Sequence, residues 1–328
     1  MVQINFSRLK ENIKKFKKPI IAVVKADAYG HGMKRIAKVL SNQGVKMFAV
    51  ANPDEGIKLR KQGTSGQILV MGMSFKNDFK SLIESDIDIA IHSIEMANEL
   101  QCIAQELGKT ARAQIYIDTG MARLGFMPTK QTINEINQIL AMNYIKVAGM
   151  FGHLASPQNA TYTKMQNKRF LYVTRNFKDI PLHLGLDYDF VRPGLALYDG
   201  VMGVKSAVSF LKTIPKGECV GYDQRFCATR PTVIATVPVG YANGLSRRMG
   251  EGRGRVLING EYAQIVGSVC MDQFMVDVTD IAPSVGDEVV IMGTQGDKQI
   301  TAKDIALICQ TIPYEIVCKF GKCVDTKD

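Results

Sequence analysis

The sequence predicts an α/β protein, a TIM-type (β/α)8 barrel followed by a mainly antiparallel β domain. Two different sequence patterns, one in each part of the 328 residues, indicate this fold class. Residues 1–200 alternate short apolar runs with longer helical patterns, which is typical of parallel strands joined by helices. From about Lys205 the chain becomes strand-length segments punctuated by glycine. Because one hydrophobic core rarely serves more than about 250–300 residues, we expect two domains, residues 1–205 and 206–328, with residues 1–10 as a candidate to pair with the β domain.

Eight apolar runs of strand length provide the predicted barrel strands. The first run, residues 20–25, begins with five apolar, mostly β-branched residues, which suit a strand buried on both faces. The others are residues 47–51, 67–71, 87–91, 113–118, 146–151, 181–184 and 195–198. Only ten residues, 185–194, separate the last two. This is too short for an ordinary crossover helix, so the final unit must be abbreviated.

The second half is predicted to be a mainly antiparallel β domain with one short helix. Its strands are residues 207–214, 232–237, 255–258, 263–269, 275–278 and 288–292, and the helix is residues 302–310. Short strands with glycine between them are typical of antiparallel sheets.

Composition and the amino terminus predict a soluble, cytosolic protein. The hydrophobic fraction of 46% and the charged fraction of 22% are ordinary for a globular chain. No apolar run is long enough to span a bilayer, and the opening MVQINFSRLK has no apolar signal core. The seven cysteines form no CxxC pair, and no histidine cluster of metal-ligand spacing lies beside Cys318 and Cys323. We therefore expect reduced thiols and no metal site.

The net charge of +10 could indicate nucleic-acid binding, but it also suits anionic small ligands, which we expect together with no nucleic-acid or membrane partner. The lysines are spread along the chain, and the densest group is Lys14, Lys15, Lys17 and Lys18. A solvated helix face explains this group better than a nucleic-acid contact.

The stretch IIAVVKADAYGHG, residues 20–32, is the first candidate for chemistry. Lys25 stands at the carboxyl end of a buried strand, where α/β folds keep their reactive groups. One interpretation is that Lys25 ends the strand and points into water. The other is that its partly desolvated amine loses a proton and forms a Schiff base. The residue pattern by itself leaves both open.

Several segments together resemble bacterial alanine racemases. The run AVVKADAYGHG is similar to the cofactor-lysine motif of that family. Further similar pieces follow in the family's order along nearly the whole chain: IDTGMARLG at 117–125, VRPGLALYDG at 191–200, GYD at 221–223, VGYANG at 239–244, VCMDQ at 269–273 and IPYEI at 312–316. The resemblance implies an enzyme that uses pyridoxal 5′-phosphate to interconvert L- and D-alanine, supplying D-alanine for peptidoglycan.

Racemisation requires removal of the Cα proton on one face and delivery on the other, so two bases are needed. The resemblance implies that these bases are Lys25 and Tyr222. A free phenol with a pKa of about 10 is a poor base at neutral pH, so Tyr222 needs positive charge or hydrogen-bond donors nearby. His153 and Arg192 resemble the family residues that supply them. For His153 alone, a hydrogen-bonded histidine at a strand end is the alternative interpretation.

Two arginines have implied roles at the cofactor and the substrate. Arg192 resembles the residue that hydrogen-bonds the pyridine nitrogen; because arginine stays protonated, the ring becomes a weaker electron sink. An acidic residue there would indicate different chemistry. Arg123 resembles the residue that steadies the substrate carboxylate and the second base. A surface ion pair is the alternative interpretation for Arg123.

The remaining implied contacts concern the phosphate, the substrate entryway and a second subunit. Phosphate donors map onto Tyr29, Tyr314, Gly194 and Leu195, and glycine lets the backbone approach closely. Substrate-site and entryway residues map onto Tyr241, Met271 and Asp272. The resemblance also implies a homodimer with composite sites, in which Lys25 of one chain meets the β domain of the other.

The chain departs from the family pattern in two places. After the seventh strand the family usually has an HxANS-like segment, whereas here LGLDYDF follows His183, and Asp187 would repel a phosphate unless it turns away. We therefore expect a weakened phosphate site. Tyr116 occupies the position of a lysine that many relatives carbamylate to orient Arg123. Tyr116 cannot be carbamylated, so something else must hold that arginine, and a bound chloride is one candidate.

Three alternatives to an alanine racemase are considered. A racemase of another small amino acid such as serine would share the same motifs. A barrel-type pyridoxal-phosphate amino-acid decarboxylase also combines a barrel with a β domain, but it usually has an acid at the ring nitrogen and lacks a base like Tyr222. A cofactor-binding barrel without turnover generally lacks the β domain.

Overall fold

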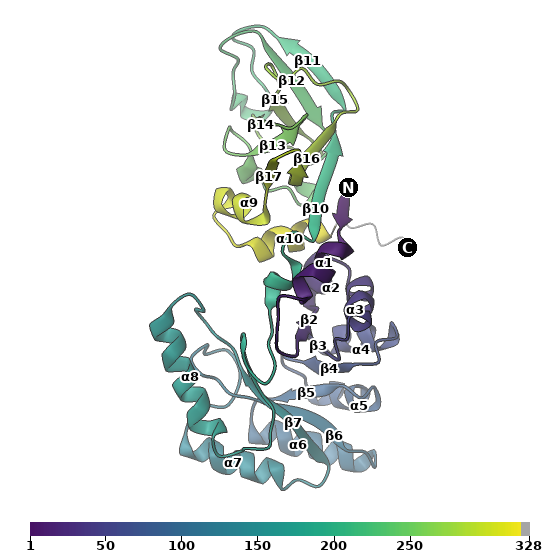
Figure 1. Ribbon diagram of the computed structural model, residues 1–328, viewed down its shortest axis with the longest axis vertical. Coiled ribbons are helices and arrows are strands. Elements are labelled where there is room, and N and C mark those ends of the chain that lie inside the picture. Colours follow the sequence, from purple (N-terminus) through teal and green to yellow (C-terminus); the bar gives the residue numbers. More distant parts are fainter. Residues whose placement is uncertain (323–328) are drawn as a thin grey trace. The chain divides into compact units, whose positions relative to one another are not determined.

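The computed structural model describes residues 1–322, and the chain divides into two compact units (Figure 1). Unit 1 contains Met1–Leu9, Tyr29–Gly32 and the chain from Tyr198 onwards. Unit 2 contains Lys10–Ala28 and Met33–Leu197. Each unit has a sheet of its own.

Unit 2 contains the barrel sheet of eight strands in the order β2-β3-β4-β5-β6-β7-β8-β9. The strands β2 to β8 are parallel, and β9 is antiparallel to β8. The bounds are β2 Ile21–Val23, β3 Met47–Val50, β4 Gln67–Val70, β5 Asp88–Ile91, β6 Ala111–Tyr116, β7 Ile145–Gly152, β8 Leu182–Leu184 and β9 Asp187–Tyr188. Strands β2 and β5 are buried throughout, as expected for parallel strands covered on both faces. The predicted fold class is thereby confirmed for this half.

The last position of the barrel differs from the prediction. Residues 195–198, predicted as the eighth strand, lie in the 3₁₀ helix η1, Gly194–Tyr198. The sheet returns to its start through a single parallel bridge between Ile20 and Val191, where the Ile21 amide donates to the Val191 carbonyl over 2.9 Å. Pro193 has no amide to donate to a ladder. The final unit is therefore abbreviated, as the ten-residue spacing predicted.

Helices alternate with the strands of unit 2, and several of them begin at a side-chain cap. Their bounds are α1 Phe6–Ile13, which runs from unit 1 into unit 2, then α2 Lys25–Gly30, α3 Met33–Asn42, α4 Pro53–Lys61, α5 Lys76–Glu84, α6 Ile94–Glu106, α7 Lys130–Leu140 and α8 Ala160–Thr174. Asn52, Ser93, Thr129 and Asn159 accept a backbone N–H at the starts of α4, α6, α7 and α8. The apolar residues of α3 recur at helical spacing and are buried.

Unit 1 contains an antiparallel sheet in the order β1-β10-β16-β13-β14-β15-β12-β11, with β17 paired to β16. The bounds are β1 Val2–Ile4, β10 Met202–Ala207, β11 Phe210–Ile214, β12 Thr232–Val237, β13 Arg255–Ile258, β14 Glu261–Val266, β15 Phe274–Asp277, β16 Glu288–Gln295 and β17 Lys298–Ile300. Two helices follow, α9 Ala302–Cys309 and α10 Pro313–Gly321. The predicted strand 207–214 is in fact the end of β10 and all of β11, and α10 was not predicted.

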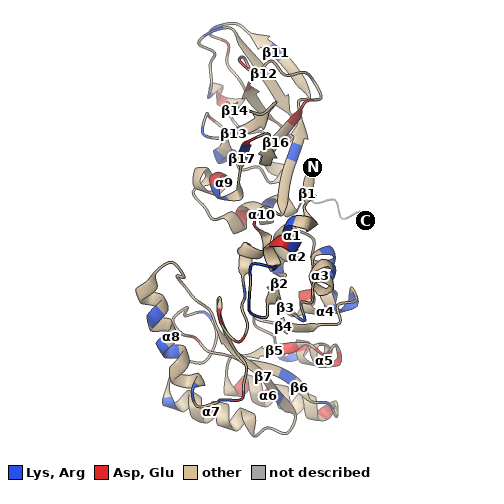
Figure 2. Ribbon diagram, viewed as in Figure 1, with Lys and Arg blue, Asp and Glu red and all other residues tan. Residues whose placement is uncertain are grey.

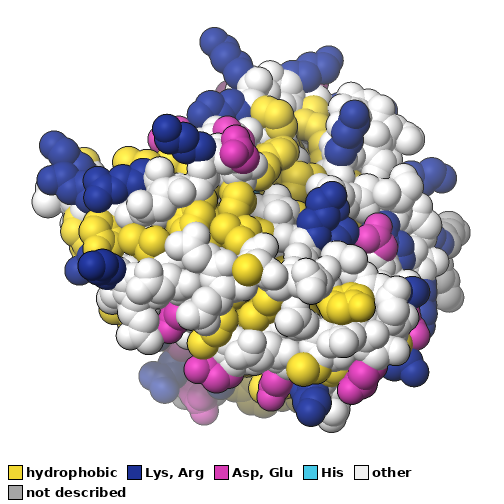
Figure 3. All heavy atoms as spheres, turned by 90° about the horizontal axis from the view of Figure 1, so that it is seen from below, with side chains coloured by type: hydrophobic (Ala, Val, Ile, Leu, Met, Phe, Trp, Pro, Cys, Tyr) yellow, Lys and Arg dark blue, Asp and Glu magenta, His cyan; other side chains and the backbone are white. Residues whose placement is uncertain are grey.

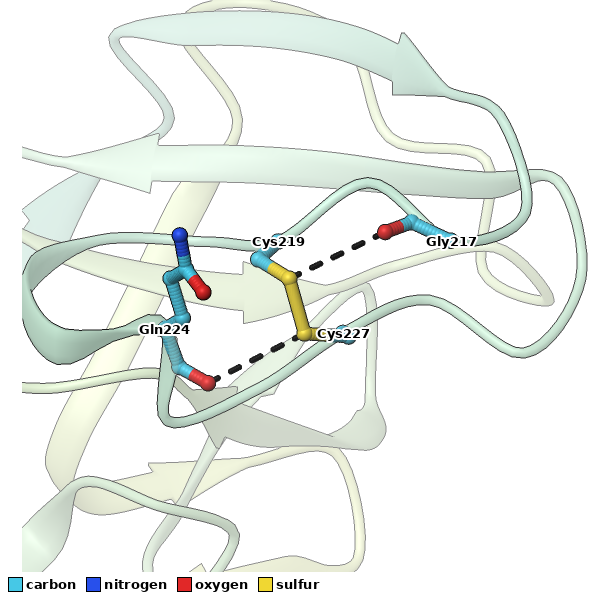
Figure 4. The surroundings of a disulfide bond; sticks show 4 residues. All are labelled: Gly217, Cys219, Gln224 and Cys227. Carbon is cyan, nitrogen blue, oxygen red and sulfur yellow. Dashed lines mark hydrogen bonds between the residues drawn. A yellow bond between two sulfur atoms is a disulfide. The ribbon is translucent and has the colours of Figure 1, made fainter.

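One prediction about the cysteines is wrong. Cys219 and Cys227 form a disulfide with an S–S distance of 2.03 Å (Figure 4). The two residues face each other in an antiparallel bridge, which brings their side chains together. Cys102, Cys270, Cys309 and Cys318 are free thiols, and Cys323 lies outside the described residues.

Charged residues are distributed over both units (Figure 2). On the face shown in Figure 3, Lys and Arg side chains occur around the whole outline and near the centre, among apolar and polar surface. The four lysines between residues 14 and 18 are exposed, but they follow the end of α1 and do not lie on a helix face as predicted. Within residues 1–322, no helix has both the length and the apolar character needed to cross a membrane, and no cluster of three metal-ligand side chains occurs.

Candidate active site

Lys25 begins a short turn of left-handed backbone directly after β2. Four consecutive non-glycine residues have positive φ: Ala26 at 50°, Asp27 at 54°, Ala28 at 56° and Tyr29 at 53°. Left-handed backbone costs about 1–2 kcal/mol for each L-residue. Such strain persists only where the surrounding contacts enforce it, and it is characteristic of functional sites.

Hydrogen bonds to two carboxylates hold this turn in place. Glu55 accepts from the Ala26 amide over 2.7 Å and from the Ala51 amide over 2.8 Å, so it joins the ends of β2 and β3. Asp27 accepts from the Met33 amide over 2.8 Å, at the start of α3. The sequence pattern did not indicate Glu55; its only signal is its place in the first turn of a helix capped by Asn52.

Arg192 is buried against the carboxyl end of β7. Its Nη2 donates to the Gly152 carbonyl, and its Nη1 lies 3.7 Å from the Met71 sulfur. The guanidinium carbon is 5.4 Å from the centre of the Phe151 ring. An arginine that is 9% exposed stays charged, so a positive charge is fixed at this end of the barrel.

His153 follows Gly152 and remains neutral. Desolvation, followed by the charges of Arg192, Arg123 and Lys25, lowers the pKa of His153 to about 4. Because the His153 side chain is exposed in the single chain, solvent reduces the effect of desolvation on its pKa. Repulsion by the three cations is therefore the better-supported reason that the pKa is lowered. Thus Lys25, Arg123 and Arg192, which are far apart in sequence, all lower the pKa of His153 in unit 2.

The Tyr116 hydroxyl is a hydrogen-bond partner of Arg123. Arg123 Nη2 donates to it over 3.4 Å, which is a long bond. Tyr116 is 2% exposed and stacks on Phe151, with ring centres 4.6 Å apart. Phe151 stacks in turn on His183, with ring centres 5.0 Å apart. The phenol is thus fixed by its ring, and Arg123 has a neutral partner.

The segment after β8 contains Asp187, whose carboxylate is paired with a lysine. Asp187 accepts from the Lys18 ammonium over 3.2 Å and from the Tyr188 amide over 2.8 Å. The Tyr188 amide first, and then Lys18, lower the pKa of Asp187. The aspartate is therefore neutralised by a neighbouring lysine. His183 Nε2 lies 2.8 Å from Gln114 Oε1, and burial lowers the pKa of His183 well below its usual value.

The residues implied in phosphate binding lie in both units. In unit 1 the ring of Tyr29 packs edge-on against Tyr198 and Tyr314, with centres 5.2 and 5.4 Å apart. In unit 2 Gly194, with φ of 54°, and Leu195 begin the 3₁₀ helix η1. The positive φ of Gly194 is one that other residues rarely adopt.

Unit 1 brings together the other predicted substrate residues. Tyr222, Met271 and Asp272 line a hollow of about 560 Å³. Tyr241 joins them through the backbone, because its amide donates to the Cys270 carbonyl over 3.1 Å. The side chains of Tyr222 and Met271 are 68% and 53% exposed. This hollow is open to solvent and has an ionisable phenol and a carboxylate at its rim.

The donor set fits pyridoxal phosphate. A primary amine, a buried guanidinium and a second arginine gather around a neutral imidazole in unit 2, and these cations favour an anionic ligand. The four residues that follow Lys25 have left-handed backbone, so the chain next to the amine has a defined conformation. Together these features provide an attachment point and a positive environment.

A barrel with a lysine after its first strand, followed by an antiparallel β domain, defines a class of pyridoxal-phosphate enzymes that act on amino acids. The comparisons with known proteins specify the family. The alanine racemase N-terminal domain matches residues 2–201, and the alanine racemase C-terminal domain matches residues 201–327. The chain belongs to the alanine racemase family, whose members are pyridoxal-phosphate-dependent isomerases.

Individual relatives are similar over nearly their whole length. An alanine racemase of Clostridium novyi is 36% identical over 362 aligned positions, which cover 98% of this chain and 92% of that one. The solved structure of an alanine racemase of Clostridium difficile 630 is 34% identical, with a TM-score of 0.88 and coverage of 97% and 92%. A histidine racemase of Leuconostoc mesenteroides is 26% identical, with a TM-score of 0.88 and coverage of 97% and 95%.

Proposed function

We propose that the protein interconverts L- and D-alanine, using pyridoxal 5′-phosphate and two bases, Lys25 and Tyr222. The observation that carries this proposal is a grouping of three side chains in unit 2. Lys25 follows β2, and Arg192 lies over the Phe151 ring and donates to the Gly152 carbonyl. Arg123 donates to the Tyr116 hydroxyl, and the Tyr116 ring stacks on Phe151. The grouping contains an attachment point, a carboxylate partner and a positive group for the ring nitrogen, and it lacks an acid at the position of Arg192.

The cofactor, when bound, supplies the electron sink that stabilises the charge left at Cα. Lys25 would hold the cofactor, Arg192 and His153 would lie at its ring nitrogen, and its phosphate would accept from Tyr29, Tyr314, Gly194 and Leu195. Arg123 binds the substrate carboxylate, and Tyr241, Met271 and Asp272 border the entry. These roles are supported by the motifs and by the packing of each residue.

Proton movement is assigned to two atoms of the chain. Lys25 Nζ removes or delivers the Cα proton on the face of D-alanine, and Tyr222 Oη does so on the face of L-alanine. Each group must lie within hydrogen-bond reach of Cα on its own side. A fixed arginine in place of an acid keeps the ring nitrogen without a proton, which disfavours decarboxylase chemistry and side reactions.

We also propose a cytoplasmic homodimer with composite sites. Family membership supports this assembly and a role in supplying D-alanine for peptidoglycan. An isologous dimer gives two equivalent sites, each completed by the partner's β domain. The short segment after β8 supports weaker cofactor binding than in relatives with a full HxANS-like segment.

The experiment that tests the function is loss of optical rotation for a panel of amino acids, with and without added pyridoxal phosphate. L- and D-alanine should racemise fastest, and activity after dialysis should depend on added cofactor. The panel includes serine, and also histidine because one similar structure is a histidine racemase. Faster racemisation of another amino acid would overturn the substrate assignment. Carbon dioxide release without racemisation would overturn the reaction.

A further inference from the structure

The loop that carries Tyr222 is closed by the Cys219–Cys227 disulfide (Figure 4). On the inner side of the disulfide, the Val220 amide donates to the Phe226 carbonyl over 2.8 Å; on the outer side, the Ala228 amide donates to the Glu218 carbonyl over 2.8 Å. The five residues 221–225 therefore form the tip of a hairpin whose neck is the disulfide.

The neck is anchored in a hydrophobic core, and the tip is not. Val220 and Ala228 are buried in a cluster with Ile214, Ile234 and Val266. All five residues from 221 to 225 are exposed. At the tip, the Ser268 hydroxyl donates to the Tyr222 carbonyl over 3.5 Å, at the limit of a hydrogen bond. The disulfide therefore joins the two ends of the tip covalently at the point where the buried neck begins.

The tip also has strained backbone. Asp223 and Gln224, which follow Tyr222, have φ of 60° and 51°, and Gly221 before it has φ of 73°. Non-glycine residues rarely hold positive φ unless the surrounding structure enforces it. A disulfide across the neck is such a constraint, because it prevents the two ends of the tip from separating.

We propose that the Cys219–Cys227 disulfide is a positioning element for Tyr222, so that the redox state of this pair sets the rate of proton transfer on the face of L-alanine. The inference rests on the proposed function, in which Tyr222 Oη is one of two bases. The cysteines touch neither substrate nor cofactor in this proposal and act through the loop.

The reductant is a dithiol, either a small reagent or a protein with a C-x-x-C motif. Its thiolate attacks one sulfur, the S–S bond breaks, and a mixed disulfide forms. The second thiolate of the dithiol then displaces the remaining cysteine. The dithiol loses two electrons and two protons in closing its own disulfide, and each Sγ of Cys219 and Cys227 gains one electron and one proton.

A backbone carbonyl oxygen lies near each sulfur of the disulfide and could accept a hydrogen bond from the thiol formed on reduction. Cys219 Sγ lies 3.7 Å from the Gly217 carbonyl oxygen, and Cys227 Sγ lies 3.8 Å from the Gln224 carbonyl oxygen (Figure 4). A disulfide sulfur has no proton, so these contacts become hydrogen bonds only after reduction. Cys227 is exposed and Cys219 half-buried, which gives a dithiol access. Disulfides of cytosolic proteins are usually transient or redox-sensing.

The test follows Cα–H exchange of L- and D-alanine separately in D₂O, in holoenzyme equilibrated with mixtures of oxidised and reduced dithiothreitol. Alkylation and peptide mass spectrometry quantify the thiols at Cys219 and Cys227. Reduction should slow exchange of L-alanine about tenfold to a hundredfold, the effect of displacing a catalytic group by roughly 1 Å. Exchange of D-alanine, which uses Lys25, should remain nearly unchanged, and the activity and thiol midpoints should coincide.

Cysteine variants distinguish a loss of Tyr222 positioning from a general loss of structure. Cys219→Ser with Cys227→Ser should behave like the reduced enzyme and ignore dithiothreitol. Cys102→Ser removes an exposed free thiol and should keep the full redox response. Equal slowing of L- and D-alanine exchange, or unchanged exchange after verified reduction, would overturn the proposal. So would free thiols at Cys219 and Cys227 in protein purified in air.

A second readout does not depend on activity. Amide hydrogen exchange at Val220, whose N–H is bonded across the neck, should accelerate on reduction. The Ile265 amide, bonded to the Gly254 carbonyl over 2.9 Å elsewhere in unit 1, should not change. If the oxidised enzyme racemises no amino acid, the proposed function fails. The Val220 exchange then still decides the role of the disulfide, and an unchanged rate rejects it.

Discussion

Gly30 is the position where an added methyl group should most disturb the backbone near Lys25. Its φ is 79°, and a Cβ built there lies 2.7 Å from Gly321 Cα and 2.8 Å from the Val317 carbonyl oxygen. Positive φ costs an L-residue about 1–2 kcal/mol, and overpacking costs about 1–3 kcal/mol. Gly30→Ala should therefore lower the free energy of unfolding by about 2–5 kcal/mol.

Gly32 and Gly321 allow the backbone cost and the packing cost to be measured separately. Gly32 has φ of 87° but nothing within 4 Å of a built Cβ, so Gly32→Ala should cost only the backbone part, about 1–2 kcal/mol. Gly321 lacks a positive φ, but a Cβ there would overlap Gly30 Cα. Gly321→Ala should therefore cost only the packing part, about 1–3 kcal/mol.

The assay is urea unfolding of the three variants by circular dichroism, together with the cofactor retained after gel filtration. Gly30→Ala should have the lowest urea midpoint and lose the most cofactor, because Gly30 ends the turn that begins at Lys25. A cost for Gly30→Ala no greater than that for Gly32→Ala would refute the close approach of Gly30 and Gly321. A cost well below the sum of the two controls would show that α10 moves to relieve the overlap.

Three further predictions concern the candidate site. Lys25→Ala should abolish the visible absorbance of bound pyridoxal phosphate, and a retained band would refute Lys25 as the attachment point. Tyr222→Phe should slow Cα–H exchange of L-alanine far more than that of D-alanine; equal slowing would mean that Tyr222 is not a base specific to one face. Arg123→Gln should raise the pKa of His153 from about 4 toward its ordinary 6.5, measured by NMR, whereas Arg175→Gln should not. As pH falls from 6.5 to 4, the unfolded chain takes up this proton before the folded one, so stability should fall, and less so in Arg123→Gln.

Much of the fold could be predicted from the sequence because buried parallel strands appear as continuous apolar runs. Strands β2 to β8 each overlap a predicted run, with ends displaced by at most two residues. The run at residues 195–198 is equally apolar but forms a 3₁₀ helix. Its burial comes from tertiary packing, which an apolar pattern alone cannot distinguish from a strand.

The site was less predictable, because several of its supports depend on contacts between distant residues. Glu55 reaches the Ala26 amide across 29 positions of sequence, and nothing in its local pattern indicates a role. The left-handed turn contains Ala26 and Ala28, whose side chains favour right-handed helices. Cys219 and Cys227 have no recognisable disulfide spacing; only the hairpin register places them opposite each other.

The pairing of β1 with β10 has a consequence for the order of folding. Val2 lies opposite Val204, so the first strand to be synthesised has its partner some 200 residues later. At about 5–20 residues per second, the interval is roughly 10–40 s. Strands β2 to β8 pair in chain order and meet no such delay. During synthesis the barrel strands can thus pair while β1 is still without its partner strand β10. The unit that contains Tyr222 is therefore completed last.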